Sequence, residues 1–235
     1  MKKILTTLSD KWAEYILEIL VITLGILGAF LLNNWNEQRK TNLATRDALR
    51  NVMEDLRQDS VQFQFHVVNS DRIARNLRKT INNLLEEKSD DSLEYYFQRS
   101  SGYLVAVVHN SAFQSMNEQG LIPNIQDEEL RLAIMRYFNF AQPSVVKLRE
   151  FEYARLQSTV NKINTDAAID MDQVTVDDLA LDYAITRKIL MEPGNFRKLY
   201  VYRETQDFLK TRSEGYVEVN TNLIESIKKY LKDTP

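Results

Sequence analysis

The chain has 235 residues, of which 44% are hydrophobic and 27% are charged, and its net charge is −3. This balance is ordinary for a folded protein, and it gives no basis for nucleic-acid binding, which needs a concentration of positive charge. The chain has no cysteine, which excludes disulfides, thiolate zinc sites and catalysis by a thiol.

The first element is a nearly unbroken apolar run from Tyr15 to Leu32. At about 1.5 Å per residue, the run crosses most of a hydrocarbon core of roughly 30 Å. The rest of the chain is rich in charge and reads as one helical body. We therefore predict a short tail at 1–14, a transmembrane helix at 15–35 and a helical bundle domain at 36–235.

Aromatic residues flank the run at the places where such side chains meet the two membrane interfaces: Trp12, Tyr15 and Trp35. The run has no small-residue cleavage pattern at its end, so we predict an uncleaved signal anchor. Basic residues are nearly balanced on its two sides. Because a short basic tail before a first apolar segment usually stays inside, we place the domain outside the cytoplasm.

A long helix is predicted to follow, from about residue 36 to 88, because no glycine or proline occurs between Gly28 and Gly102. Its apolar stripe recurs every three or four residues: Leu49, Met53, Leu56, Ser60, Phe63, Val67, Ser70, Ala74, Leu77, Ile81 and Leu84. The stripe continues backwards in register into the apolar run, so we expect one helix without a hinge. The polar cluster 88–92 should end it.

Shorter elements are predicted next, at 93–98, 111–119, 127–139, from Pro143 onward and at 176–190, with an extended stretch at 103–108. Gly120 is a suitable helix end and Asp127 a suitable cap. The helix opened by Pro143 should bury one face: Val146, Tyr153, Leu156, Val160 and Ile163.

A terminal helix is predicted at 195–232, capped by Asn195 and with a local bend at Gly215. Its apolar residues repeat every seven positions, as in coiled coils: Leu209, Tyr216, Leu223 and Tyr230. Two long striped helices thus bracket several shorter ones. The sequence predicts an all-α fold, an antiparallel helical bundle with the transmembrane helix continuous with its first long helix.

Two blocks of the sequence carry a resemblance. The first is Glu18-Ile19, Gly25-Ile26-Leu27 and Asn33-Asn34-Trp35-Asn36-Glu37, and the second is Ala112-Phe113-Gln114-Ser115-Met116, Gly120-Leu121-Ile122 and Asp127-Glu128-Glu129-Leu130-Arg131. The chain resembles an uncharacterised family of small single-pass membrane proteins common in Bacteroidota. The resemblance implies a Gram-negative envelope and no known reaction.

Glu18 is the residue that most invites a functional interpretation, because an acid inside an apolar run is costly and often marks function. It lies about 9 Å past Trp12, so it can reach the headgroups or be protonated. A hydrogen bond to a partner helix and a proton relay also stay open. Gly25 and Gly28 share its face, and Ala29 follows; small residues let helix backbones approach closely. These four residues are the predicted interaction face.

Other candidates favour ordinary structural roles. His66 and His109 lack a second ligand at metal spacing, so we interpret both as surface or capped histidines. Six aspartates lack the glycine and terminal glutamate of an EF-hand, which indicates a solvated acidic connector: Asp166, Asp170, Asp172, Asp177, Asp178 and Asp182.

No motif for catalysis was found either. Ser100, Ser101 and Ser111 lack the context of a nucleophile, and there is no glycine-rich phosphate loop. Four aromatic residues indicate packing at a bundle end rather than a ligand site: Tyr95, Tyr96, Phe97 and Tyr103. The sequence therefore predicts no catalytic residue, no metal and no cofactor.

The function predicted from the sequence is a non-enzymatic, membrane-anchored bundle that binds or scaffolds an envelope partner, with a sensing role left open. Its partners would be the lipid bilayer and a membrane or periplasmic protein, or a second copy held through the anchor. The predicted location is the inner membrane, single-pass, with the bundle in the periplasm. The alternative is a proton-coupled energy-transducing subunit that uses Glu18.

Overall fold

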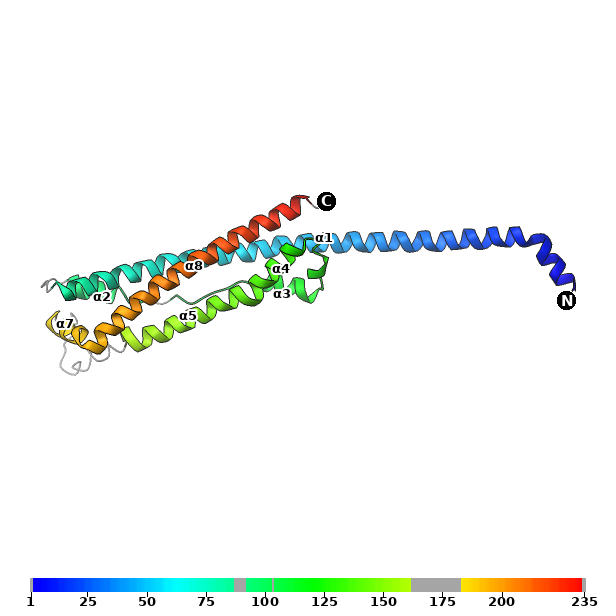
Figure 1. The fold of residues 1–235 in the computed structure, drawn as a ribbon. Coiled ribbons are helices and arrows are strands. Elements are labelled where there is room, and N and C mark those ends of the chain that lie inside the picture. The colour runs from blue at the N-terminus through cyan, green and yellow to red at the C-terminus, as the bar shows by residue number, and fades with distance from the viewer. Residues whose placement is uncertain (1, 87–91, 103, 162–182, 234–235) are drawn as a thin grey trace, which may run out of the picture.

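The computed structural model describes residues 2–86, 92–102, 104–161 and 183–233 (Figure 1). Its helices are α1 (Lys2–Leu85), α2 (Ser92–Gln98), α3 (Ser111–Glu118), η1 (Ile122–Asn124), α4 (Glu128–Arg136), η2 (Tyr137–Ala141), α5 (Gln142–Leu156), η3 (Gln157–Asn161), α7 (Tyr183–Met191) and α8 (Pro193–Asp233). No strand occurs in these ranges, and the all-α prediction is confirmed.

Helix α1 is one uninterrupted helix of 84 residues, which at the usual rise is about 126 Å long. It contains the apolar run and the whole predicted stripe, so the prediction of a single helix without a hinge is confirmed. Residues 36–40 are exposed, and Thr45 is the first buried side chain among those that the structure describes. The bundle therefore begins beyond residue 40, on the C-terminal side of the apolar run.

Helix α8 returns along α1 in the opposite direction (Figure 1). Arg46 Nη2 donates to the carbonyl oxygen of Leu231 (2.7 Å), and farther along Lys210 Nζ donates to Asp71 Oδ1 (2.9 Å). Residue numbers rise on one helix as they fall on the other. The antiparallel packing of the first and last long helices is thus confirmed.

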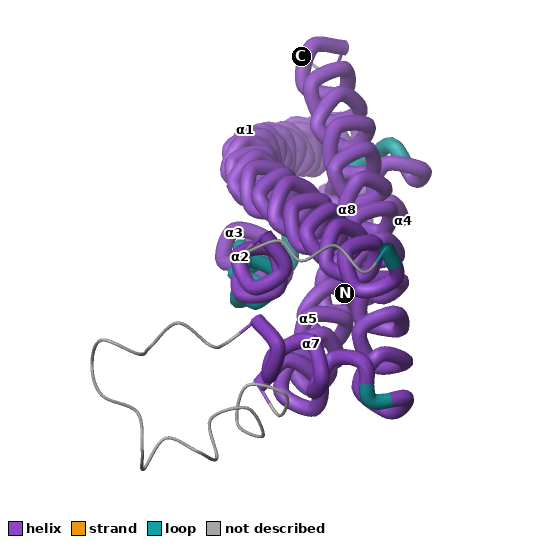
Figure 2. Tube along the Cα trace, turned by 90° about the vertical axis from the view of Figure 1, so that its left-hand side faces the viewer, coloured by secondary structure: helices purple, strands orange, loops and turns teal. Residues whose placement is uncertain are grey.

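The remaining helices surround this pair. Seen along the bundle, α2 and α3 lie to the left of α1, α8 and α4 lie to the right, and α5 lies below (Figure 2). An irregular segment, 104–110, connects α2 to α3. The predicted extended stretch at 103–108 therefore forms no strand in its described part, residues 104–108.

Most of the apolar core falls into two clusters. The proximal cluster, nearer the apolar run, contains Leu49, Val52, Met53, Leu56, Phe113, Met116, Leu121, Ile122, Ile125, Leu130, Ile134, Tyr137, Phe138, Leu223, Ile224 and Ile227. The distal cluster contains Ile73, Leu77, Leu84, Leu93, Phe97, Leu156, Leu190, Leu199 and Tyr202. The predicted stripe of α1 supplies both clusters. Phe97 packs as expected, whereas Tyr95 is 50% exposed.

Two local predictions about helix ends are confirmed. Asp127 caps α4, since its side chain accepts the N–H of Leu130 (3.0 Å). Gly120 ends α3 with φ of +66°, a conformation that glycine adopts without strain. The N–H groups of Gly120 and Leu121 return to the carbonyls of Asn117 and Met116 (both 3.0 Å), which is the Schellman arrangement.

The predicted break before Pro143 is wrong. The chain stays helical from Glu128 to Asn161, and the π-helical turn η2 lies directly before the proline. A proline in a helix lacks an N–H and clashes with the carbonyl four residues earlier. A wider turn relieves that clash without ending the helix.

The predicted buried face of α5 is also wrong. Leu156 is buried as expected, but Tyr153 is 45% exposed. The buried face contains Val145 together with two charged residues, Arg149 and Glu152. A search for apolar periodicity cannot find a face that is charged. Val160 and Ile163 lie outside what the structure describes of side chains.

The start of α8 differs from the prediction as well. The helix begins at Pro193, and Asn195 lies inside it, where its Nδ2 donates to the carbonyl of Ile189 at the end of α7 (3.0 Å). Asn195 thus joins two helices instead of capping one. The helix passes through Gly215 without interruption. Of the predicted helix 176–190, residues 176–182 lie outside the described ranges.

The register of α1 can be tested by measuring stability. Phe63 and Leu77 are 1% and 0% exposed, so replacing either with alanine should lower the free energy of unfolding by about 2 to 5 kcal/mol. Arg57 is exposed and pairs with Glu54, one turn away, so Arg57→Ala should change it by less than about 0.5 kcal/mol. Equal shifts in the denaturation midpoints of core and surface variants would contradict this register.

Candidate functional site

The predicted interaction face lies on a part of α1 that contacts no other element. The apolar window is 0% buried inside the structure, and among the described residues this is the helix long and apolar enough to cross a membrane. Glu18 is exposed, and a Cβ added at Gly25 or Gly28 would meet no atom within 4 Å. Ala29 is exposed too. The face is open to lipid or to another helix.

The predicted interfacial aromatics are also exposed. Trp12 and Trp35 are 62% and 61% exposed, and Tyr15 is 46% exposed. The guanidinium of Arg39 lies over the Trp35 ring, 5.8 Å from its centroid. An aromatic ring beside a cation at the end of an apolar run matches the chemistry of a headgroup layer.

A hollow of about 580 Å³ lies just past Trp35, where the turn η1 approaches α1. Its lining is mainly amide and hydroxyl side chains: Asn34, Glu37, Gln38, Thr41, Asn42, Pro123, Asn124 and Gln126. Residues of the first resembling block, such as Asn34 and Glu37, here meet the stretch between Ile122 and Asp127 of the second block. The structure thus brings together two segments that the sequence reasoning treated separately.

Between the proximal and distal clusters the bundle contains polar side chains, which sequence reasoning missed. Asp59 of α1 is 0% exposed. Its Oδ2 accepts hydrogen bonds from the hydroxyl of Tyr137 and from Nε2 of Gln142 (both 2.7 Å). Its Oδ1 accepts the backbone N–H of His109 (2.7 Å) and lies 3.1 Å from the Nδ1 of the same residue. Asp59 therefore joins α1, η2, α5 and the segment before α3.

A second buried acid, Asp55, caps α3 from α1. Its Oδ2 accepts the N–H of Ala112 in the first turn of α3 (2.9 Å), while Asn110, which precedes that helix, makes no side-chain cap. Burial raises the pKa of Asp55 more than the N–H of Ala112 lowers it. The eight-residue helix α3 thus has one of its free N–H groups satisfied by a neighbouring helix.

A buried ion pair forms the other half of this polar layer. Arg149 Nη1 donates to Glu152 Oε2 (2.7 Å), and the two side chains are 2% and 0% exposed. Arg149 Nη2 also donates to Ser213 Oγ (2.9 Å), and Gln206 Nε2 donates to Glu152 Oε1 (2.9 Å). The pair therefore links α5 to α8. Buried charges are tolerated only when they are paired in this way.

His66 corrects one prediction. It is 1% exposed, so it is not a surface histidine, and neither ring nitrogen has a partner among the described residues. Burial, and then the charge of Arg149, lower the pKa of His66 to about 4. His109, in contrast, is held by Asp59, as expected of a capped histidine. His66 is buried in its neutral form.

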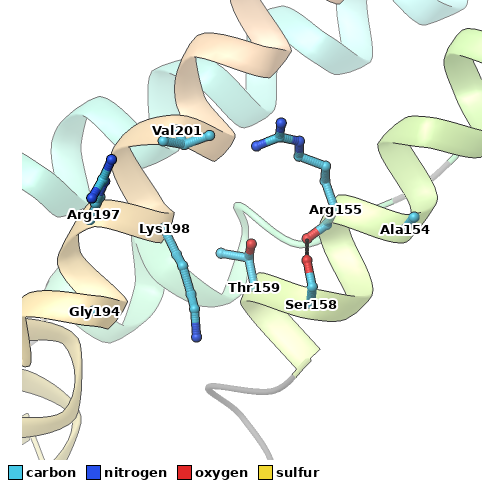
Figure 3. Close-up of a pocket in the computed structure, with 8 residues that line it drawn as sticks. All are labelled: Ala154, Arg155, Ser158, Thr159, Gly194, Arg197, Lys198 and Val201. Atoms are coloured by element: carbon cyan, nitrogen blue, oxygen red, sulfur yellow. Dashed lines mark hydrogen bonds between the residues drawn. The ribbon is translucent and has the colours of Figure 1, made fainter.

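A cleft of about 480 Å³ lies where the end of α5 and η3 meet the start of α8 (Figure 3). Three of its lining residues are basic, namely Arg155, Arg197 and Lys198, and none is acidic. Figure 3 shows Arg155 pointing toward Val201, whereas Lys198 points the other way. The three charges border the cleft without meeting at one point.

Metal ligands do not gather in the described ranges. No group of three or more His, Asp or Glu side chains in them is arranged to hold a metal ion. The acidic stretch 166–182 lies outside those ranges. Ser100 is buried and donates to the carbonyl of Phe97.

A scan against models of protein families, a search of curated proteins and a search of solved structures all gave no match to this chain. Membership of the Bacteroidota family therefore stays a prediction. Function has to be argued from the open face of α1, the polar layer and the surface of the bundle.

The buried His66 predicts how stability depends on pH. Its folded pKa of about 4 lies below the unfolded value of 6.5, so its contribution is complete above pH 6.5. That contribution is lost as the pH falls toward 4, because the unfolded state then binds the proton more tightly; the loss is about 3 kcal/mol.

The measurement is denaturant unfolding of the full chain in detergent at pH 7 and pH 4.5. The fall in unfolding free energy should be clearly smaller in His66→Gln, which has no proton to bind in this range. An equal fall in the variant would show that other groups cause the pH dependence.

Proposed function

We propose that this chain is a non-enzymatic scaffold, anchored in the inner membrane by its N-terminal helix, whose periplasmic bundle holds an envelope partner. One observation carries the proposal. The same uninterrupted helix, α1, provides both the unpacked apolar run and the central helix of the bundle. A chain with this design joins a membrane to a folded domain without a flexible linker.

The rigid junction gives the proposal a mechanism. Residues 36–40 are helical and exposed, and beyond them α1 packs against α8 through contacts such as that of Arg46 with Leu231. A tilt or rotation of the bundle must therefore move the apolar run as one body with it. Coupling of this kind is how rigid elements transmit a change between two sites.

The open face of the apolar run supports docking of another helix. Gly25 and Ala29 follow Glu18 by seven and eleven residues, so at 3.6 residues per turn they lie within about 20° of it. Gly25 and Gly28 have no neighbour to fill the space beside them. A second helix can come close there and meet the carboxyl group of Glu18.

A proton-coupled subunit is the competing proposal. It is favoured by one fact, that Glu18 is an exposed acid with no partner among the described residues. An acid in lipid is stabilised by a partner helix, and such residues serve as proton relays. Both proposals need a neighbouring chain, and they differ in whether the proton of Glu18 matters.

Two substitutions distinguish these proposals. Glu18→Gln keeps the shape and hydrogen-bonding groups of the side chain but removes its titratable proton. Gly25→Leu leaves the acid intact and blocks close approach of a helix. For a scaffold, the partner should co-purify with the Gln variant after mild detergent extraction and be depleted by about tenfold or more with the Leu variant.

The matched control is Leu24→Ile, an exposed position in the same run that adds no bulk to the face. A Glu18→Gln phenotype equal to deletion of the protein, at normal abundance and with the partner still bound, would replace the scaffold proposal with the proton-coupled one.

The orientation can be tested with a single cysteine, because the chain contains none of its own. Glu218 of α8 is exposed, so Glu218→Cys should react with an impermeant maleimide once the outer membrane is permeabilised. The unsubstituted chain is the control and should stay unlabelled. Labelling that requires lysis of the inner membrane would place the bundle in the cytoplasm.

A further inference from the structure

Residues 104–108, which lie between α2 and α3, have the exposure pattern of a strand, although they pair with no other strand in the described ranges. Val105 and Val107 are 65% and 47% exposed. Leu104, Ala106 and Val108, which alternate with them, are half-buried. Side chains that alternate in this way belong to an extended backbone, and the sequence is rich in β-branched residues, which favour that conformation.

The segment is fixed at both ends and free in the middle. Near its start, Arg72 Nη1 donates to the carbonyl of Arg99 (2.8 Å), and at its end Asp59 accepts the N–H of His109 (2.7 Å). Between these points the backbone groups of residues 104–108 make no hydrogen bond within the described chain. A row of backbone donors and acceptors is thus unpaired within the described chain.

Apolar side chains of α1 are exposed at the same level of the bundle. Val61, Phe65 and Val68 are 56%, 59% and 56% exposed. All three lie on α1 between Asp59 and Arg72, the residues that fix the segment. The exposed valines of the segment and the exposed side chains of α1 therefore occupy the same stretch of the bundle.

We propose that residues 104–108 form an open β edge that binds an extended segment of a partner protein by strand addition. Donors and acceptors that repeat every second residue are matched by another extended backbone, which offers the same repeat. The partner segment would carry apolar side chains at alternate positions, to cover the valines and Phe65. This inference rests on the proposed scaffold function and names the surface that holds the partner.

A symmetric pair of copies does not fit this edge. Two copies anchored in one membrane are related by a twofold axis along the membrane normal, and the segment runs along α1, close to that direction. Such an axis makes the backbone N–H and C=O groups of the same residue in the two segments point toward each other. In a parallel pair, however, the residue opposite each hydrogen-bonded residue directs its own N–H and C=O groups away from the partner strand. The occupant is therefore a different polypeptide.

The edge also stands away from the lipid. Asp59 and Arg72 lie 24 and 37 residues beyond Trp35, which places the segment about 35 to 55 Å from the membrane interface along α1. The partner segment therefore belongs to a soluble protein or to a domain that extends well out of the membrane.

The test uses the full chain in lipid nanodiscs and a synthetic peptide of nine residues, with valine and threonine alternating between terminal lysines. Saturating peptide should slow hydrogen exchange at alternate amides of residues 104–108 by about tenfold or more, because the N–H groups on the bound edge are protected. The same peptide with N-methyl groups on alternate nitrogens cannot pair along that edge and should bind about tenfold more weakly.

Two matched pairs of variants complete the test. Consecutive N–H groups of a strand point to opposite edges, so only one of Val105→Pro and Ala106→Pro should weaken binding of the peptide. The other variant is its control. Phe65→Ala should weaken peptide binding several-fold, whereas Phe208→Ala, at a similarly exposed position on α8, should leave peptide binding unchanged. Circular dichroism and the melting midpoint verify that each variant is folded.

Three outcomes would contradict the proposed β edge. The peptide could leave hydrogen exchange in 104–108 unchanged, or the methylated and unmethylated peptides could bind equally well. The segment could also be protected without peptide, in a dimer of two copies of the chain. The proposed function fails separately, if no envelope protein co-extracts with the intact chain while the peptide still protects the edge. If a partner co-extracts equally with both proline variants, the scaffold function stands and residues 104–108 are not the surface that binds the partner.

Discussion

The packing of α8 against α1 is the contact on which the rest of the bundle depends. The two helices cover each other's stripes over most of their shared length, from Arg46 beside Leu231 to Arg78 beside Asp207. Helices of seven or eight residues, such as α2 and α3, are too short to be stable alone. They form because α1 offers them an apolar surface and, through Asp55, a cap for α3.

The polar layer fixes the position of α8 along α5. Replacing a buried ion pair with apolar residues is often neutral or stabilising, so the pairing of Arg149 with Glu152 is weak evidence of added stability. Its geometric effect is clearer. A slip of α8 by one turn would separate Gln206 from Glu152 and leave buried charges short of partners. Two purely apolar clusters would tolerate such a slip far better.

Sequence periodicity predicted the parts of the fold whose signal is local. The stripe of α1 and the cap at Asp127 need only neighbours within one or two turns, and both were found. The buried face of α5 was missed because it contains Arg149 and Glu152, which an apolar pattern does not include. The burial of His66 was missed because a single histidine carries no local signal of burial. Asp59 was missed because its partners Tyr137 and Gln142 follow it by 78 and 83 residues. At the open face of α1, the sequence predicted Glu18 and Gly25, and the structure adds that nothing in the described chain covers them.

The return of α8 toward the apolar run decides how the bundle would bear a mechanical load. The end of α8 and the point where α1 enters the bundle lie at the same end of the molecule (Figure 1). A force applied between them opens the seam like a zipper, breaking the contact of Arg46 first and reaching the ion pair of Lys210 with Asp71 only later. A force that pulls the two helices past each other along their axes strains every contact at once. The bundle is therefore weak to peeling from its proximal end and strong to shear.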